Sequence, residues 1–221
     1  MKISAIVPAA GSGSRFGINT NKLLEEINGI PIIVRTLKVL SECDVISEII
    51  IPTSANLTDI LNAYVIKYKL NKVKKVILGG ETRQESVFNA LKSCEKPDFV
   101  LIHDGARPLI SLNIINNAIK TAVDKGSAVV AVPVKDTIKV VDNDIIVDTP
   151  DRSTLWQVQT PQIFIYSDLL HAHEKFQHEF VTDDAALIEK IGNKVFIEMG
   201  CYKNLKVTTP EDLVIARALV E

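Results

Sequence analysis

The alternation of short apolar runs with amphipathic segments is the feature that most constrains how this 221-residue chain can fold. Several of the apolar runs are rich in β-branched residues and continuously hydrophobic, which is typical of strands covered on both faces of a sheet. The expected strands are Ile3–Val7, Glu48–Ile51, Lys75–Leu78, Phe99–Ile102 and Ser127–Val132. Strands that alternate with helices predict an α/β fold with a mostly parallel, twisted sheet, helices on both faces and right-handed crossovers.

Helix signals lie between and after these runs. Thr82 and Glu85 fit a capping box, Ser111 is a good N-cap for a helix that ends near Asp124, and Thr209 precedes a proline at a first helical position. The other expected elements are a helix Pro31–Leu40 with proline at its first position, a helix Ser86–Lys92, a strand Gln162–Ile165, helices Ser167–Lys175 and Asp183–Lys190, and a strand Lys194–Glu198.

A different pattern follows Pro133. The segments Thr137–Val141 and Ile145–Asp148 flank a polar Asp-Asn-Asp turn and predict a β-hairpin. A two-stranded hairpin is marginally stable alone, so its apolar residues need cover. We expect one domain over residues 1–221, with this hairpin either protruding as an arm at about 135–158 that packs on a second subunit, or folding back as an edge of its own domain.

Bulk composition excludes several classes of protein. The formal net charge is −2, which gives no general attraction to nucleic acid or to an acidic membrane. No apolar run approaches the roughly 20 residues that cross a bilayer. The chain has three widely spaced cysteines without a CxxC pair, and Met1 lies just ahead of the first expected strand. We therefore expect free thiols, no signal or transit peptide and a cytoplasmic location.

The segment AIVPAAGSGSRFG, Ala5 to Gly17, places a glycine-rich loop after the first expected strand. It fits neither of two familiar phosphate-binding patterns. The dinucleotide pattern G-x-G-x-x-G and the Walker pattern G-x-x-x-x-G-K-[ST] both require glycine where Phe16 stands. A tight turn with solvated charges is one interpretation of this loop. The other is an anion site formed by backbone amides, with Arg15 and Lys22 as its cations, suited to phosphoryl or nucleotidyl transfer.

Two further loops follow expected strands. Asp104 comes directly after the strand that ends at Ile102, where a carboxylate is placed to hold Mg²⁺ together with substrate phosphates or, alternatively, to cap a turn. We expect His103 to be structural, because transfer to a phosphate needs no base. The segment 79–86 combines two glycines with Arg83 and Ser86 near a helix N-terminus, which is suited to recognition of an anion or a base.

Seven motifs occur in order between residues 8 and 213: P-A-A-G-x-G-x-R, G-G-x-x-R-x-x-S-V, H-D-x-A-R-P, V-P-V-x-D-T-I-K, D-R-x-x-L-W-x-x-Q-T-P-Q-x-F, T-D-D and N-L-K-V-T-T-P-E-D-L. Together they resemble the 2-C-methyl-D-erythritol 4-phosphate cytidylyltransferase family over nearly the whole chain. The resemblance implies a Rossmann-like domain with a β-arm, a homodimer, CTP and methylerythritol phosphate as substrates, Mg²⁺ as cofactor and release of pyrophosphate. Gly105 and Glu81 depart from the alanine and aspartate usual in the family.

The resemblance also implies a role for individual residues. Arg15, Lys22 and Lys206 correspond to catalytic cations, and Asp104 to the magnesium contact. The residues implied around CTP are Ala9, Ala10, Gly11, Gly13, Gly80, Arg83, Ser86 and, near the ribose, Ala106. Those implied around the second substrate are Arg107, Thr137, Arg152 and Thr160, some of them acting across the dimer.

Three other functions fit parts of the pattern. A ribitol 5-phosphate cytidylyltransferase shares the chemistry, but it usually carries serine and valine where this chain has Gly105 and Ala106. A sugar-1-phosphate nucleotidyltransferase lacks the arm and the Q-T-P-Q segment. A non-catalytic nucleotide-binding regulator on the same fold is the third alternative, although such proteins usually lose a catalytic cation or the metal carboxylate, and this chain keeps both.

Overall fold

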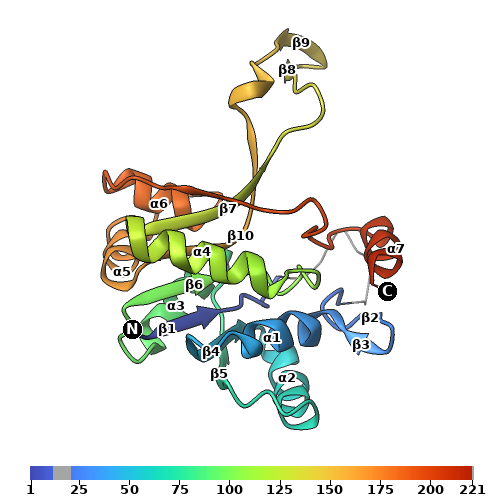
Figure 1. The fold of residues 1–221 in the computed structure, drawn as a ribbon, viewed down its shortest axis with the longest axis vertical. Helices are drawn as coiled ribbons and strands as arrows, with labels where there is room; N and C mark the ends of the chain where they lie inside the picture. Colours follow the sequence, from blue (N-terminus) through green and yellow to red (C-terminus); the bar gives the residue numbers. More distant parts are fainter. Residues whose placement is uncertain (12–20, 221) are drawn as a thin grey trace.

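Within residues 1–11 and 21–220, which the computed structural model describes, seven strands form one mixed sheet in the order β11-β7-β10-β6-β1-β4-β5 (Figure 1). They are β1 (Ile3–Ile6), β4 (Ile46–Thr53), β5 (Val73–Leu78), β6 (Phe99–Ile102), β7 (Ser127–Pro133), β10 (Trp156–Ile165) and β11 (Ile197–Met199). Only β10 runs antiparallel to its neighbours in this sheet. The prediction of a mostly parallel α/β sheet is confirmed.

Helices cover both faces of the sheet, each over its own hydrophobic core. One core contains buried residues of α1 (Ile32–Glu42), α2 (Ala55–Lys67), α4 (Leu112–Lys125) and α7 (Pro210–Leu219). The other contains buried residues of α3 (Arg83–Ser93), α5 (Tyr166–Lys175) and α6 (Asp184–Lys190). In β1, Ile3 and Ala5 belong to the first core and Ile6 to the second. This alternation explains why the strand sequences are apolar at successive positions.

Local sequence signals account for most helix starts. The predicted capping box at Thr82 is present, and Thr209 forms a second one with Asp212. The Ser111 side chain accepts from the backbone N–H of Ile114, as expected of an N-cap. The prediction for Pro31 is wrong by one position, because Pro31 ends the short strand β3 (Ile30–Pro31) and is the N-cap of α1 rather than its first residue.

Several elements differ from the sequence prediction. Helix α2 was not predicted, because it buries only Leu57 and Leu61 and leaves most of its surface polar or exposed. The short hairpin of β2 (Glu26–Ile27) and β3 (Ile30–Pro31) was also missed. Strand β10 begins six residues earlier than the predicted Gln162, since its first half pairs with β7 along the route to the arm. Strand β11 is shorter than predicted and lies further along the chain.

The predicted hairpin protrudes from the body of the molecule as an arm (Figure 1). Its strands β8 (Val140–Asp142) and β9 (Ile145–Asp148) are joined by Asn143 and Asp144, which both have positive φ, as in a type I′ turn. Every residue of both strands is exposed. The short helix η2 (Arg152–Thr154) follows the hairpin on the way back to the sheet. The alternative of an edge folded onto its own domain is therefore wrong.

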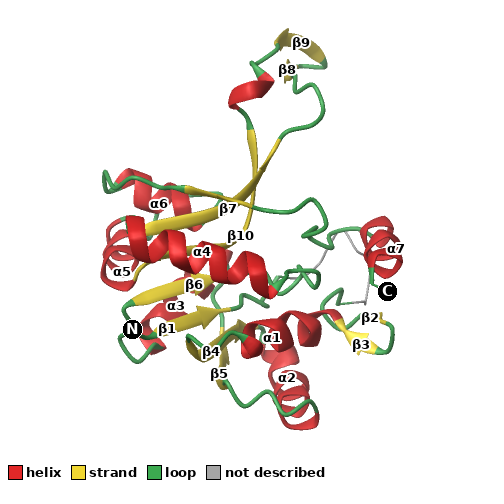
Figure 2. Cartoon of the chain, in the orientation of Figure 1, coloured by secondary structure: helices red, strands yellow, loops and turns green. Residues whose placement is uncertain are grey.

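Parallel pairing brings the loops that carry the predicted motifs to one edge of the sheet. Strands β6, β1, β4 and β5 pair in parallel, so that the loops after β1, β5 and β6 leave from the same end (Figure 2). The chain continues from β1 to β4 on one side and from β6 to β7 on the other. Ligands of open α/β sheets bind at the point where the chain switches direction across the sheet in this way. Among the described helices, none is long and apolar enough to cross a membrane.

Candidate active site

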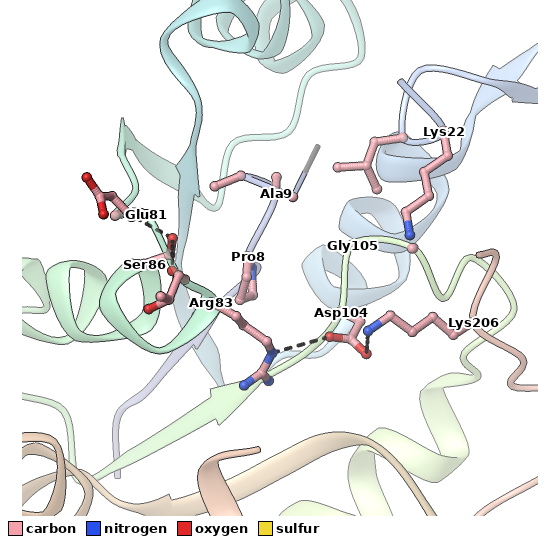
Figure 3. A pocket seen from close by; sticks show the side chains of 15 residues that line it. Pro8, Ala9, Lys22, Glu81, Arg83, Ser86, Asp104, Gly105 and Lys206 are labelled. Atoms are coloured by element: carbon pink, nitrogen blue, oxygen red, sulfur yellow. Dashed lines mark hydrogen bonds and ion pairs between the residues drawn. The ribbon is translucent and has the colours of Figure 1, made fainter. Parts of the chain in front are cut away.

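A cavity opens at the carboxyl edge of the sheet, where the three loops meet the segment that follows β11 (Figure 3). The described residues that line it are Pro8, Ala9, Ala10, Gly11, Lys22, Leu23, Gly80, Glu81, Thr82, Arg83, Ser86, Asp104, Gly105, Ala106 and Lys206. Nine of the predicted site residues are in this set: Ala9, Ala10, Gly11, Lys22, Gly80, Arg83, Ser86, Ala106 and Lys206, together with the predicted metal ligand Asp104. The fold thus brings together motifs that are far apart in the sequence.

Asp104 is at the centre of a charge cluster on this cavity. Its Oδ2 lies 3.1 Å from Nζ of Lys206 and 3.3 Å from Nε of Arg107, and its Oδ1 lies 3.8 Å from Nε of Arg83. The backbone N–H of Asp104 donates to the hydroxyl of Thr160. Three cations from three different segments therefore surround one carboxylate.

This cluster fixes the protonation of Asp104. Burial alone favours the neutral acid, but Lys206, Arg83 and Arg107 outweigh it and hold the pKa of the carboxyl well below its usual range. Burial lowers the pKa of the Arg107 guanidinium, against the effect of Asp104. An ionised oxygen ligand is thus present at the edge of a cavity that otherwise carries cations, which suits a metal-bound polyanion.

The loop after β5 is closely packed. A Cβ added to Gly80 would lie 2.2 Å from Cβ of Glu85, and one added to Gly79 would lie 2.7 Å from Oγ of Ser86, so both positions require glycine. Ser86 Oγ accepts from the backbone N–H of Gly80 and donates to the carbonyl of Thr82. The Ser86 hydroxyl hydrogen is therefore already engaged, and this side chain can offer a ligand only its remaining lone pair.

The loop after β1 contributes Ala9, Ala10 and Gly11 to the cavity wall. The backbone of Ala9 is occupied within the sheet, because its N–H donates to Pro52 and its carbonyl accepts from the Thr53 hydroxyl. Figure 3 shows Lys22 extending toward Gly105. The predicted residues Gly13 and Arg15 lie outside the described part of the chain.

Two of the residues predicted around the second substrate lie beneath the cavity rather than on its wall. The guanidinium of Arg107 is buried and donates to the carbonyl of Asn204 as well as to Asp104. Thr160 is buried, and its hydroxyl contacts both the Asp104 N–H and Nδ1 of His103. The direction of the Thr160–His103 hydrogen bond is set by the tautomer of the ring. Both residues support Asp104 in this structure.

His103 has the structural surroundings predicted for it. Its ring is fully buried, and burial lowers its pKa to about 4. Its Nε2 atom has no hydrogen-bond partner in the described structure. A neutral, buried imidazole that is hydrogen-bonded through Nδ1 to the Thr160 hydroxyl is a support for Thr160 and the Asp104 loop.

The remaining two predicted residues lie on the arm. Thr137 and Arg152 are exposed, and Arg152 donates to the carbonyl of Lys135 at the arm's base. Neither belongs to the set of residues that line the cavity. Within a single chain, the arm extends away from the body that holds the site (Figure 1).

Two further residues, Asp184 and His173, support this cluster from behind, and neither was among the predicted site residues. Asp184 Oδ2 lies 2.7 Å from Nη1 of Arg83, and Asp184 Oδ1 lies 3.1 Å from Nε2 of His173. The side chains of Asp184 and His173 are both 1% exposed. The T-D-D motif marked the position of Asp184, but only the fold reveals its partner.

Comparison with known proteins gives a consistent result. The family model described as 2-C-methyl-D-erythritol 4-phosphate cytidylyltransferase matches residues 3–221. Proteins of that name from Caldanaerobacter subterraneus subsp. tengcongensis and Geobacter metallireducens are 46% and 41% identical to the chain, covering 98% and 100% of it and 97% and 98% of their own lengths.

Solved structures extend the same likeness to three dimensions. A 4-diphosphocytidyl-2C-methyl-D-erythritol synthase from Anaerococcus prevotii superposes with a TM-score of 0.85 at 33% identity, over 98% of this chain and 97% of that one. A 2-C-methyl-D-erythritol 4-phosphate cytidylyltransferase from Thermus thermophilus superposes with a TM-score of 0.83 at 28% identity, over 99% and 98% of the two chains. The arrangement of the seven-stranded sheet is thus shared with these enzymes.

Proposed function

Because the chain belongs to the 2-C-methyl-D-erythritol 4-phosphate cytidylyltransferase family, we propose that its cavity is where CMP passes from CTP to 2-C-methyl-D-erythritol 4-phosphate. The products are 4-diphosphocytidyl-2-C-methyl-D-erythritol and pyrophosphate. The observation that carries this placement is the convergence of Lys22, Lys206 and Arg83 on the cavity that also holds Asp104. A triphosphate and a phosphate monoester need such a concentration of cations.

The reaction asks the protein mainly for positioning and charge stabilisation. A phosphate oxygen of the acceptor attacks the α-phosphorus of CTP, the new P–O bond forms, and the bond to pyrophosphate breaks on the opposite side. The attacking phosphate is already an anion, so no side chain has to remove a proton. Lys22 and Lys206, with Arg15 from the part of the chain outside the described residues, act on the charge that builds up on the phosphates.

The nucleotide is expected to lie along the loops after β1 and β5. In this proposal the cytosine faces Gly80 and Ser86, where the close-packed turn leaves backbone groups and one lone pair of Ser86 for base recognition. Ala10, Gly11 and Gly13 approach the phosphates, and Ala106 approaches the ribose. Arg83 is expected to contact the nucleotide from the cavity wall.

Asp104 fits the role of ligand for a divalent cation such as Mg²⁺. It offers hard oxygen donors, and its lowered pKa keeps it ionised at neutral pH. The described residues contain no cluster of three or more metal-ligating side chains, so further ligands would come from phosphates and water, as is common for Mg²⁺. When bound, the cation would neutralise charge on the triphosphate and orient it for attack.

The chain is proposed to act as one domain, residues 1–221, that dimerises through its arm at about 135–158. The exposed apolar residues of β8 and β9 support this proposal, since Val141, Ile145 and Val147 are each more than half exposed. An exposed two-stranded arm with an apolar surface needs a partner to cover it. Thr137 and Arg152 would then reach the acceptor phosphate in the partner's site rather than in their own.

The test is release of pyrophosphate by the purified protein supplied with CTP and MgCl₂. We expect release with 2-C-methyl-D-erythritol 4-phosphate, much less with ribitol 5-phosphate, and none after chelation with EDTA. Preference for ribitol 5-phosphate would favour the related cytidylyltransferase, and no release with either acceptor would favour a nucleotide-binding regulator.

A further inference from the structure

Arg83 contacts two carboxylates that differ in their surroundings. Asp104 faces the cavity and also pairs with Lys206 and Arg107. Asp184 lies behind Arg83, with its side chain 1% exposed, and makes the closer contact at 2.7 Å. Together the two carboxylates outweigh the effect of burial and raise the pKa of Arg83.

The carboxylate of Asp184 is held by a histidine opposite Arg83, and its backbone is held by the sheet. Nε2 of His173 donates to its Oδ1, and the His173 ring stacks on Phe88 of α3 with the two planes 8° apart. The backbone at the start of α6 is tied to β10 by Gln162, which donates to the Asp183 side chain and accepts from the Ala185 N–H. Asp184 is thus fixed relative to the central sheet.

Arg83, the first residue of α3, has a long side chain. Without a fixed partner, this side chain would sample many rotamers. Ordering an arginine when a ligand binds costs conformational entropy, up to about 2 kcal/mol for a freely rotating side chain. A guanidinium that already donates to a fixed carboxylate loses less on binding.

We propose that Asp184 is a positioning residue that holds the Arg83 guanidinium in the orientation in which it meets the nucleotide, with His173 fixing Asp184. This inference rests on the proposed function, because it takes the ligand of Arg83 to be CTP. It assigns to the second aspartate of the T-D-D motif a task different from that of the first, which caps α6.

A buried ion pair can also exist for structure alone, so the two roles need different measurements. Asp184→Asn keeps the size of the side chain and an oxygen that accepts from His173, but it removes the charge opposite Arg83. If Asp184 positions Arg83, CTP binding weakens. If the pair only stabilises the fold, the thermal midpoint falls while CTP binding by the folded protein stays unchanged.

The experiment measures KM for CTP, KM for methylerythritol phosphate, and the CTP dissociation constant by calorimetry in the presence of MgCl₂. For Asp184→Asn we expect KM and Kd for CTP to rise about tenfold, which is the range for loss of one charge-assisted hydrogen bond. KM for the acceptor should change less than twofold. In an Arg83→Gln background, the same substitution should add nothing further to either constant for CTP.

Two more variants complete the test. Leu187→Val removes volume from the buried face of the same helix without touching Arg83, and it should lower the thermal midpoint with KM for CTP unchanged. His173→Phe keeps the stacking on Phe88 but removes the donor to Asp184, and it should raise KM for CTP by a smaller factor. His173→Phe replaces a buried aromatic ring with an apolar ring of similar shape, and we therefore expect the variant to fold.

Wild-type KM for CTP in both Asp184→Asn and His173→Phe would overturn the inference, as would effects of Asp184→Asn and Arg83→Gln that simply add. An equal rise in Leu187→Val would also overturn it, because the effect would then follow stability. A wild-type protein that releases no pyrophosphate would instead overturn the proposed function.

Discussion

The ammonium nitrogen of Lys206 lies 3.1 Å from Oδ2 of Asp104, so that the loop before α7 meets the loop after β6 across the cavity. Two hydrogen bonds hold these loops together: the backbone N–H of Val207 donates to the carbonyl of Ala106, and the Arg107 guanidinium donates to the carbonyl of Asn204. The Lys206 side chain itself remains 38% exposed. Its backbone is therefore anchored while its charge can turn from Asp104 toward a phosphate.

Replacing Lys206 with alanine should lower turnover about 10²-fold or more, since loss of one preorganised charge donor costs about 3–4 kcal/mol in other enzymes. The variant should keep the thermal midpoint of the wild type within a few degrees, because the lost ion pair is partly exposed. Lys203→Ala, an exposed neighbour on the same loop, is the control and should retain turnover. A Lys206→Ala enzyme with normal kcat would show that this ammonium only pairs with Asp104.

Lys22→Ala should produce a similar fall in kcat, of about 10²-fold or more, because Lys22 lines the same cavity and is expected to act on the phosphates in the transition state. Steady-state assays of pyrophosphate release at saturating CTP and acceptor would measure it. Lys2→Ala, whose exposed side chain lies away from the cavity, serves as the charge-matched control. Near-normal turnover in Lys22→Ala would remove this residue from the mechanism.

The features predicted correctly from sequence depend on short-range signals. A capping box such as that at Thr82 is complete within four residues. A strand such as Ile3–Ile6, whose residues are all buried, indicates from its own sequence that both faces of the sheet are covered. The positions of Ala9 and Asp104 at one edge follow once β1 and β6 are parallel. For the same reason, the weak pattern of α2 was missed, since only Leu57 and Leu61 are buried there.

The parts that could not be predicted depend on contacts between distant segments. Arg83 and Asp184 are 101 positions apart, and nothing in either local sequence indicates that they form an ion pair. Thr160 and Arg107 have the residue types expected of phosphate ligands, yet the fold turns both toward Asp104. Residue type gives the possible chemistry of a side chain, whereas its partner depends on packing.

Stability should depend on pH through His103. Burial lowers the pKa of this ring to about 4 in the folded protein, whereas an unfolded histidine titrates near 6.5. Between these values the unfolded chain binds the proton and the folded protein does not, so the free energy of unfolding falls as pH drops from about 7 toward 4. Urea denaturation at half-unit intervals would measure this slope.

The comparison for that slope is His103→Asn, whose side-chain amide has both a donor and an acceptor and can still hydrogen-bond the Thr160 hydroxyl at the position of Nδ1. The variant should be less stable at pH 7, because a ring is lost from a buried site, and its stability should depend less on pH between 7 and 4. Its pH–rate profile between pH 6 and 9 should have the shape of the wild-type profile. An inflection present in the wild-type profile and lost in the variant would mean that His103 does titrate during the reaction.

The arm offers a test of assembly that does not depend on the cavity. Ile145 and Val147 are 67% and 58% exposed on β9, and aspartate at both positions should prevent an apolar interface from forming by burying charge. We expect wild-type protein at twice the chain mass of 24.3 kDa by light scattering, and the double variant at the chain mass. Turnover should fall when dimerisation is lost, since Arg152 would no longer reach a partner's site.

Ile66→Asp is the matched control, because Ile66 is 78% exposed on α2, away from the arm. It should remain dimeric and active. Mixing the arm variant with an excess of Lys22→Ala protein tests whether the arm interface is required for pairing of the two chains. If it is required, no activity should return, because the aspartates still disrupt the interface. A monomeric arm variant with full kcat would mean that each chain supplies its own complete site.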